Sequence, residues 1–238
     1  MLSTDEARVW ALVVESAGAR GGRMTVLDVC VVCARLLDAG GVGLSVLAGE
    51  RPEPVHTVGA LGRDLMDSAV TSGDGPCAEA LLTGAPVLAA DLADPSAGRR
   101  WPIFTEVALA VNVAAVFAFP LVTGAMRAGV LVVGRDRPGA LDPAARRDAL
   151  ILADAALTLL LDEQAGRAAE AVPAEWLGLG GAIHQAAGMV SIQLDCTVDQ
   201  ALVRLRAHAF ANDMPLTLVA RQVVERTLRF APDPTSRP

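Results

Sequence analysis

The stretch from residue 183 to 229, IHQAAGMVSIQLDCTVDQALVRLRAHAFANDMPLTLVARQVVERTLR, decides how the C-terminal part of this chain folds. Its apolar residues recur every three or four positions in three short runs, which is the spacing of amphipathic helices. Turn and cap residues separate the runs. The pattern therefore predicts an all-α bundle of three helices that share one small core.

The first of these helices is predicted over Ala182–Leu194, and one of its faces is made of small residues. Ala187, Gly188 and Ser191 lie on that face. Because glycine leaves the helix backbone uncovered, another helix or another molecule can approach this face closely. The residues expected to point inward are Ile183, Ala186, Met189 or Val190, and Leu194.

Cap residues mark the starts of the other two helices. The Thr197 hydroxyl can accept a hydrogen bond from the first turn, and Gln200, three residues later, completes a capping box. The third helix is expected to begin near Pro215, because proline is favoured at the first helical position. The residues expected in the core are Val198, Ala201, Leu202, Leu205 and Ala209, followed by Leu216, Val219, Ala220, Val223 and Leu228.

This stretch resembles the ANTAR family, the RNA-binding output domain of bacterial transcription antitermination regulators. The matching residues are Gln185, Ala186 and Gly188, then Gln200, Ala201, Leu205, Arg206 and Ala209, and finally Leu216, Val219 and Ala220. Many members carry a lysine where this chain has Ala187, so a phosphate contact expected of the family is missing here or comes from elsewhere. The resemblance implies binding to a pair of small stem-loops, which prevents a competing terminator hairpin from forming. Two stem-loops call for two such domains and hence a homodimer.

Polar side chains of the bundle are the candidate RNA contacts. Taken singly, each is better explained as part of a solvated helix face. Arginine can nevertheless pair with phosphate and stack on an unpaired base, and together the candidates form a plausible RNA surface. They are His184, Arg204, Arg206, His208, Arg221 and Arg226, with Ala186 and Gly188 allowing close approach and Arg206 the best candidate for direct contact.

The composition of the 238 residues, 53% hydrophobic and 20% charged, is typical of a globular protein with room for two modest domains. All 20 basic residues are arginine. Residues 1–172 hold 14 arginines against 21 acidic residues, whereas residues 173–238 hold 6 of each. A domain that binds nucleic acid through many phosphates would be more basic. RNA recognition is therefore expected to depend on shape and on a few placed groups.

We expect no targeting segment and no membrane-spanning segment in this sequence. The first ten residues lack a charged region followed by an apolar stretch, so they do not read as a secretory signal. The longest apolar run, residues 107–122, is interrupted by Asn112 and Pro120 and is too short to span a bilayer. We therefore expect a cytoplasmic protein without membrane contact, in which the cysteines remain thiols.

Residues 1–165 predict an α+β domain with a mainly antiparallel sheet flanked by helices. Helices are expected at 5–16, 24–38, 64–70, 77–82, 99–110 and 143–165, and strands at 42–47, 55–58, 86–90, 113–121 and 128–135. A jointed linker is expected at 166–181, because glycine and proline recur there, and it leads into the bundle at 182–238.

About residues 20–140 resemble the GAF family of small sensor domains, and the most informative segment is 72–92, SGDGPCAEALLTGAPVLAADL. The matching residues are Gly73, Gly75, Pro76, Cys77, Ala80, Gly84, Pro86, Val87 and Asp91, followed by Phe119, Pro120, Gly129, Val130 and Leu131. The resemblance implies a fold and a sensing role without naming a ligand. A largely apolar cavity for a small-molecule effector is expected near Cys77, Trp101 and Phe104.

The long helix at 143–165 carries more apolar residues than one face can use. One stripe is expected to pack on the sheet. A second stripe would then pair with another subunit, with Leu150, Leu157 and Leu160 as the dimerisation residues.

Catalytic and metal chemistry has little support. Cys30 and Cys33 form a C-x-x-C without a second pair, so we interpret them as small core residues. Cys77 lies near a predicted helix N-terminus, where a thiol pKa can be lowered, although buried packing is the preferred interpretation. With three histidines, no G-x-S-x-G elbow and no phosphate-binding loop, we expect a non-enzyme without metal or cofactor.

The predicted function is signal-responsive transcription antitermination, with a GAF domain that senses a cue and an ANTAR domain that binds nascent RNA. The alternative is a ligand-binding sensor whose helical bundle docks a protein partner.

Overall fold

The computed structural model describes residues 3–48, 51–124, 126–167, 180–212, 214 and 216–231. The chain divides into two compact units, Met1–Val172 and Pro173–Pro238. The first unit is an α+β domain and the second is helical.

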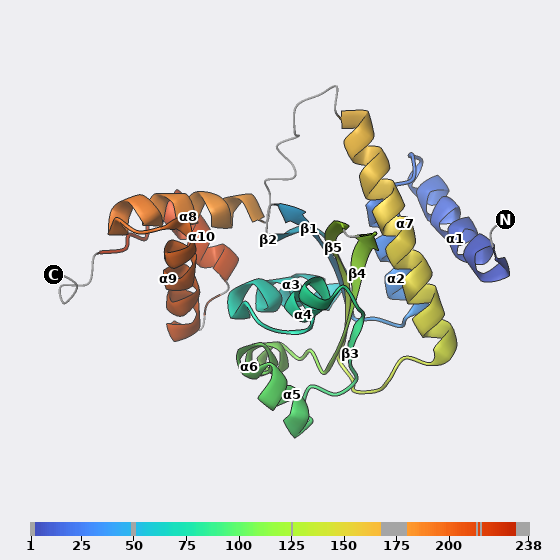
Figure 1. Ribbon diagram of the computed structural model, residues 1–238, viewed down its shortest axis with the longest axis horizontal. Coiled ribbons are helices and arrows are strands. Elements are labelled where there is room, and N and C mark those ends of the chain that lie inside the picture. The colour runs from blue at the N-terminus through green and yellow to red at the C-terminus, as the bar shows by residue number, and fades with distance from the viewer. Residues whose placement is uncertain are drawn as a thin grey trace. The chain divides into compact units, whose positions relative to one another are not determined.

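A five-stranded antiparallel sheet forms the middle layer of the first unit (Figure 1). Its strands run in the order β2-β1-β5-β4-β3. They are β1 (Gly41–Ala48), β2 (Arg51–Val58), β3 (Val87–Ala89), β4 (Ala115–Thr123) and β5 (Met126–Arg135). Residues 115–121 of β4 and 129–134 of β5 are buried without alternation, because helices cover both faces of the sheet.

Both edges of the sheet are unusual. The outer strand β2 carries Pro52 and Pro54, which pair with Leu47 and Ser45 of β1. Proline has no backbone N–H, so it is tolerated in a sheet only at an edge or a bulge. The opposite edge, β3, is three residues long.

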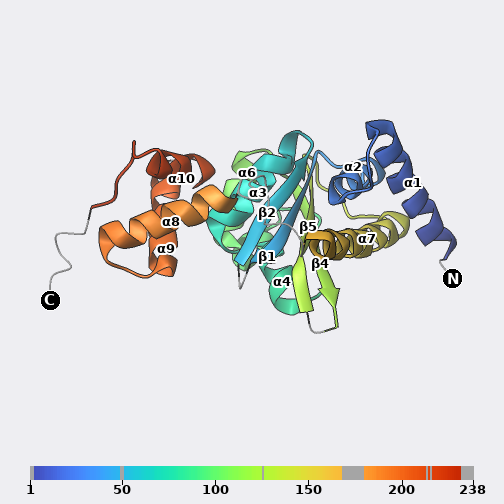
Figure 2. The same ribbon diagram turned by 90° about the horizontal axis from the view of Figure 1, so that it is seen from above.

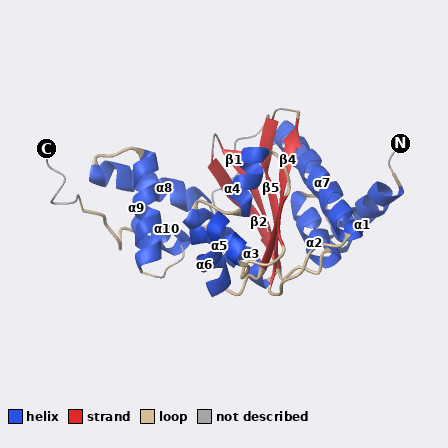
Figure 3. Cartoon of the chain, turned by 60° about the horizontal axis from the view of Figure 1, so that its bottom comes forward, coloured by secondary structure: helices blue, strands red, loops and turns tan. Residues whose placement is uncertain are grey.

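One face of the sheet is covered by α2 (Val26–Leu36) and α7 (Pro143–Arg167), and α1 (Thr4–Arg20) packs on both helices (Figure 3). Ion pairs join Arg8 to Asp148 and Asp5 to Arg147, so α1 is tied to α7. The helix α7 is thus covered on two sides within one chain, by the sheet and by the two N-terminal helices.

The apolar spacing predicts Leu27, Val31, Ala34 and Leu37 or Leu36 as the inward face of the second helix. Of these, Leu37 is fully buried, but the rest of the inward face differs. Val26, Val29, Cys30 and Cys33 are buried, whereas Val31 is exposed. Because α2 contacts the sheet, α1 and α7 together, most of its circumference is apolar, and the spacing alone does not identify which side points to solvent.

The other face of the sheet is covered by α3 (Ala60–Ser72), α4 (Pro76–Thr83) and α6 (Pro102–Ala110) (Figure 2). The short α5 (Pro95–Arg100) lies beside α6 (Figure 3). A single helix was expected over residues 99–110. The chain instead breaks at Trp101, whose φ and ψ are −136° and 71°. Pro102 restricts the residue before it to extended conformations and begins the next helix, which explains the break.

The second unit contains α8 (Gly180–Leu194), α9 (Val198–Ala211) and α10 (Leu216–Val224), and each helix packs on the other two. The predicted capping box is present, with the Thr197 hydroxyl accepting from the Gln200 N–H and the Gln200 side chain accepting from the Thr197 N–H. The buried apolar residues are Ala186, Ala187, Val190, Ala201, Leu202, Leu205, Ala209, Leu216, Val219, Ala220 and Val223.

Three residues expected in that core are not fully buried, and one of them, Leu194 at the end of α8, is half-buried. The side chain of Ile183 lies outside the described residues. Val198 is the first residue of α9 and is 43% exposed. Leu228 follows the end of α10 and is half-buried. The linker expected at 166–181 falls mostly on residues 168–179, which lie outside the described residues, while α7 continues to Arg167 and α8 begins at Gly180. Among the described helices, none has the length and apolar character that crossing a membrane requires.

Candidate functional site

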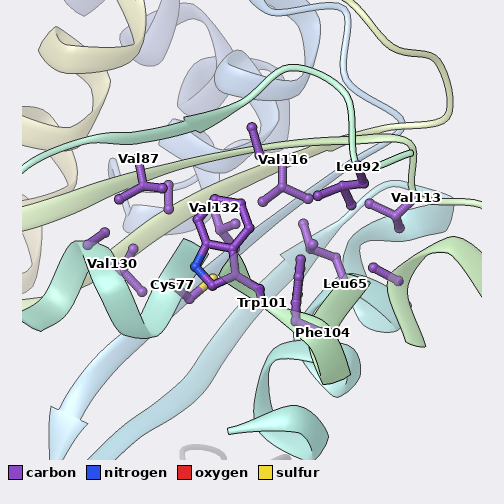
Figure 4. Close-up of a cluster of buried hydrophobic side chains, with 14 of the residues drawn as sticks. Leu65, Cys77, Val87, Leu92, Trp101, Phe104, Val113, Val116, Val130 and Val132 are labelled. Carbon is purple, nitrogen blue, oxygen red and sulfur yellow. The ribbon is translucent and has the colours of Figure 1, made fainter. Parts of the chain in front are cut away.

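The candidate ligand site is a buried apolar cluster between the sheet and the layer of α3, α4 and α6 (Figure 4). Alternation along β5 places Val130 and Val132 on this face, and Val87 and Val116 come from the neighbouring strands. The helical layer contributes the larger side chains that close the cluster, among them Leu65, Met66, Cys77, Leu81, Trp101 and Phe104.

Phe104 is fully buried and lies against the turn that precedes α4. Gly75 in this turn has a φ of 108°, and a Cβ built there would lie 2.6 Å from the Phe104 Cγ. The backbone N–H of Phe104 also donates to Asp74 Oδ1 at 3.0 Å, which satisfies a free donor in the first turn of α6. The glycine-rich turn noted in the sequence therefore positions the aromatic side chain that fills the cluster.

Trp101 connects this cluster to the surface through Glu79. The indole N–H donates to Glu79 Oε2 at 3.0 Å, and Arg100 Nε donates to the same oxygen at 2.9 Å. The Arg100 guanidinium lies 4.7 Å from the centroid of the Trp101 ring. These contacts fasten the junction of α5 and α6 to α4. The sequence offered a weak signal for Glu79, an acid in the first turn of a helix that is otherwise largely apolar.

Cys77 packs in the cluster as a small apolar residue. Burial raises the pKa of its thiol to about 12, so the thiol is protonated at neutral pH. Burial also raises the pKa of Cys30 to about 12 and that of Cys33 well above its ordinary value. The interpretation of all three cysteines as core residues is confirmed, and a reactive thiolate at Cys77 is not supported.

Cys77, Trp101 and Phe104, which were expected near an apolar cavity, lie in one continuous buried cluster. Among the described buried side chains, the hydroxyl of Thr105 in α6 is the group that lacks a hydrogen-bond partner. Thr105 follows Phe104 in the chain, and its unpaired buried hydroxyl is a group with which a ligand can form a hydrogen bond.

The residues expected to allow close approach on α8 have different surroundings. Ala186 is fully buried in the core of its own unit. It therefore does not offer the accessible surface that was expected for contact with RNA. A Cβ built on Gly188 would meet no atom within 4 Å. Gly188 therefore faces open space, and close packing of a neighbouring helix in this chain does not explain it.

The basic candidates of the second unit also separate into groups. Arg204, Arg221 and Arg226 are exposed, whereas Arg206 and His208 are half-buried. The His208 ring contacts the Phe230 ring edge-on, with 5.3 Å between the centroids. The side chain of His184 lies outside the described part of the chain. Exposure thus favours Arg204 over Arg206 for direct contact.

Large apolar side chains are exposed on the same unit. Ile192 of α8 is 85% exposed, and Val203 and Phe210 of α9 are 60% and 53% exposed. Val203 and Phe210 are seven residues apart, so they lie on one side of α9.

The expected dimerisation residues occupy two environments. Leu157 and Leu160 are buried inside the first unit, because α1, α2 and the sheet cover α7. Leu150 is 40% exposed. The second apolar stripe of α7 is therefore accounted for largely within one chain, and Leu150 is the expected contact that remains accessible.

Acidic residues at strand ends serve as turn residues where the structure describes them. Asp91, after β3, accepts from the Ala93 N–H at 2.9 Å. Within the described residues, His, Cys, Asp and Glu side chains form no group of three that would hold a metal ion.

Comparison with known proteins identifies the first unit. A family model for the GAF domain matches residues 24–182, which end within α8. The GAF domain of a phosphoenolpyruvate-protein phosphotransferase from Acinetobacter is 12% identical, with 69% of this chain and 98% of that chain covered and a TM-score of 0.51.

Two further solved structures are similar. The GAF domain of a phosphoenolpyruvate-protein phosphotransferase from Coxiella burnetii is 12% identical over 69% of this chain and 99% of that chain, with a TM-score of 0.48. The GAF-B domain of DevS from Mycobacterium smegmatis is 17% identical over 61% and 96%, with a TM-score of 0.44. No curated protein matches the sequence.

Proposed function

The chain belongs to the GAF domain family, whose members are ligand-binding sensor modules, and we propose that it is a signal-responsive regulator of transcription elongation. In this proposal the GAF domain binds a small-molecule effector, and the C-terminal helices act as an ANTAR-type domain on paired stem-loops of nascent RNA. The proposed place of action is the cytoplasm, where bacterial transcripts are made, and the proposed role is regulatory, without catalysis.

The sensing half of the proposal is supported by the apolar cluster. Its lining of valine, leucine and aromatic side chains suits a ligand with an apolar body, and the Thr105 hydroxyl suits one polar group on that ligand. Because Phe104 and Trp101 fill this region, a ligand would have to displace one of these rings. Binding would then be read out as a rearrangement of α6.

One observation supports the RNA-binding half. The C-terminal helices start and pack in the register predicted from the apolar spacing, with the Thr197 and Gln200 capping box in place and Leu205 buried. This register leaves Gly188, Arg204 and Arg221 on the surface. A compact helical surface with few charges suits RNA loops whose bases are splayed out.

Crosslinking in cells tests this function directly. We expect the chain to crosslink to a small set of transcripts that share two adjacent stem-loops upstream of a terminator, and to lose these crosslinks when Arg204 and Arg221 are replaced with glutamine. Binding to such an RNA in vitro should weaken as salt rises, because phosphate contacts release counterions. Crosslinks spread evenly over abundant RNA would argue against the proposal.

We further propose that the RNA-binding form is a homodimer, since two stem-loops require two copies of the C-terminal unit. Leu150 is the accessible member of the expected contacts. Leu150→Glu should therefore lower the mass measured by light scattering towards that of one chain, with the fold retained. Leu157→Glu is an unsuitable test of assembly, because it would place a charge inside the first unit.

A protein-docking role is the second candidate, and the exposed side chains of Ile192, Val203 and Phe210 favour it. Docking through apolar side chains should change little with salt, whereas RNA binding should fall steeply. Replacing Val203 and Phe210 with serine should abolish protein docking while phosphate-dependent RNA binding retains its salt dependence.

A further inference from the structure

The segment that follows α10, residues 225–231, is held on the helical unit by two contacts. The backbone N–H of Phe230 donates to Gln193 Oε1 of α8 at 2.9 Å. The Phe230 ring packs edge-on against His208 of α9. Because Phe230 is anchored to both helices, the backbone of its neighbour Arg229 has a defined place on the unit. We call residues 225–231 the C-terminal arm.

The turn that leads into the arm has the hydrogen bonds of a Schellman motif. The Thr227 N–H donates to the Gln222 carbonyl at 2.9 Å, and the Arg226 N–H donates to the Val223 carbonyl at 3.0 Å. Arg226 occupies the left-handed position of this motif, with a φ of 62°. Glycine is the usual residue there, because a Cβ crowds the backbone in this conformation. An arginine at this position weakens the fold, which points to a role for its side chain.

Three arginines lie within nine residues, in the arm and in the helix that leads into it. Arg221, Arg226 and Arg229 are all exposed. Glu225 is the acidic residue among the described residues from 216 to 231. In the part of the chain that the structure describes, none of these three arginines takes part in an ion pair. Their guanidinium groups are therefore available to phosphate.

We propose that the C-terminal arm contacts RNA, with Arg226 and Arg229 binding backbone phosphates and Gln193 acting as a positioning residue for Arg229. This inference rests on the RNA-binding function proposed above and names the groups that this binding uses. The arm supplies phosphate contacts, which Ala187 of α8 cannot make because it is apolar and fully buried. It also gives Arg226 a reason to occupy a position that favours glycine.

Substitutions of Arg226 distinguish its effect on stability from its effect on RNA binding, because Arg226→Gly should raise stability and lower affinity. The probe is an RNA with two stem-loops, selected on the full wild-type chain from a library with randomised loops. Arg226→Gly should raise the melting temperature of the C-terminal unit while lowering affinity about tenfold and reducing the salt slope by about 1 per subunit. Arg226→Lys should retain affinity, and Arg226→Gln should lose affinity without the gain in stability. Equal affinity for the Gly, Gln and wild-type chains overturns the role of Arg226.

A double-variant measurement tests the positioning role of Gln193. Gln193→Met keeps the length of the side chain but removes the oxygen that accepts from Phe230. Both Gln193→Met and Arg229→Gln should reduce the salt slope. The double variant should bind no more weakly than Arg229→Gln alone, because Gln193 acts through Arg229. Additive losses overturn this part of the proposal.

The outcomes distinguish the arm from the RNA-binding function itself. Arg146→Gln, at an exposed position of α7, is the matched control and should bind as the wild type does. If selection on the wild-type chain enriches no RNA, the proposed function fails and the arm with it. If the wild type binds and the variants of Arg226 and Arg229 bind equally well, the arm alone is refuted.

Discussion

The two units of this chain bury very different side chains. In the first unit, Phe104, Phe117 and Phe119 are among the largest fully buried residues. In the described part of the second unit, the buried apolar residues are alanine, valine and leucine. Aromatic rings fill a volume comparable to a ligand and can exchange places with one, whereas a core of small side chains brings helix backbones close together and leaves function to the surface. We therefore expect the function of the first unit to depend on its buried side chains and that of the second unit to depend on its surface.

The largest effect is expected from Phe104→Ala in the first unit. Removing a buried ring should lower the free energy of unfolding by about 3–5 kcal/mol. Hydrogen exchange measured on peptides should show the loss in residues 60–135 and not in residues 180–231. Phe210→Ala is the matched control, because the same ring is exposed in the second unit, and its effect on stability should be about 0.5 kcal/mol or less. Equal losses in both units would contradict two separate cores.

Leu205→Ala should produce the next largest effect, a loss of about 2–5 kcal/mol in the second unit. Because small units have little stability to lose, this substitution should unfold the three helices while the sheet remains intact. Loss of helical signal in circular dichroism, with the fluorescence of the buried Trp101 unchanged, would report that outcome. Val203→Ala, at an exposed position of the same helix, should be close to neutral.

Local signals in the sequence predicted most of the helices and strands. They did not predict which residues surround each side chain. Thr197 and Gln200 define the start of α9 by themselves, so this boundary was predicted correctly. Pro102 also carried a local signal, but the apolar spacing around it suggested one continuous helix where there are two.

Packing partners were harder to predict than helices. As predicted, α7 has apolar residues on more than one face. Periodicity does not reveal whether α1 or a second subunit covers the second face, and Leu157 is buried within the chain. The arrangement of Glu79, Arg100 and Trp101 depends on two segments that are 21 residues apart or more. Such contacts leave no periodic trace in the sequence.

Acid should affect the first unit through Asp28, which caps α2 and accepts hydrogen bonds from Arg20, Thr25 and Ser16. Burial raises the pKa of Asp28, but these hydrogen bonds outweigh it and hold the pKa below its usual range. A carboxyl with a lowered folded pKa stabilises the fold above its unfolded pKa, and this contribution is lost as pH falls through the folded value.

The stability of the first unit should therefore decline below about pH 4. Asp28→Asn should be less stable than the wild type at pH 6 and should show a flatter decline between pH 4 and 2. Urea midpoints measured across this range provide the test. Parallel pH profiles for the two chains would show that Asp28 is not the titrating group.

The smallest effect is expected at Gly188. A glycine-to-alanine substitution should stabilise the second unit at Gly188 and destabilise the first unit at Gly75. Gly188→Ala adds a methyl group to open space on a helix and should stabilise the second unit by about 0.5–1 kcal/mol. Gly75→Ala should destabilise the first unit, because its φ is 108° and the new methyl would meet Phe104. If Gly188→Ala also weakens RNA binding, a partner lies against that helix backbone; a stability loss would instead reveal packing at Gly188.

The two prolines of β2 also limit how copies of this chain can aggregate. A strand of another molecule that tried to extend the sheet would find no amide hydrogen at Pro52 or Pro54, and β3 at the far edge offers only three residues. Continuous cross-β growth is therefore blocked at both ends of the sheet, even though its strands are rich in valine. Edge-to-edge pairing between the sheets of two copies is therefore disfavoured, whichever edge meets the other molecule.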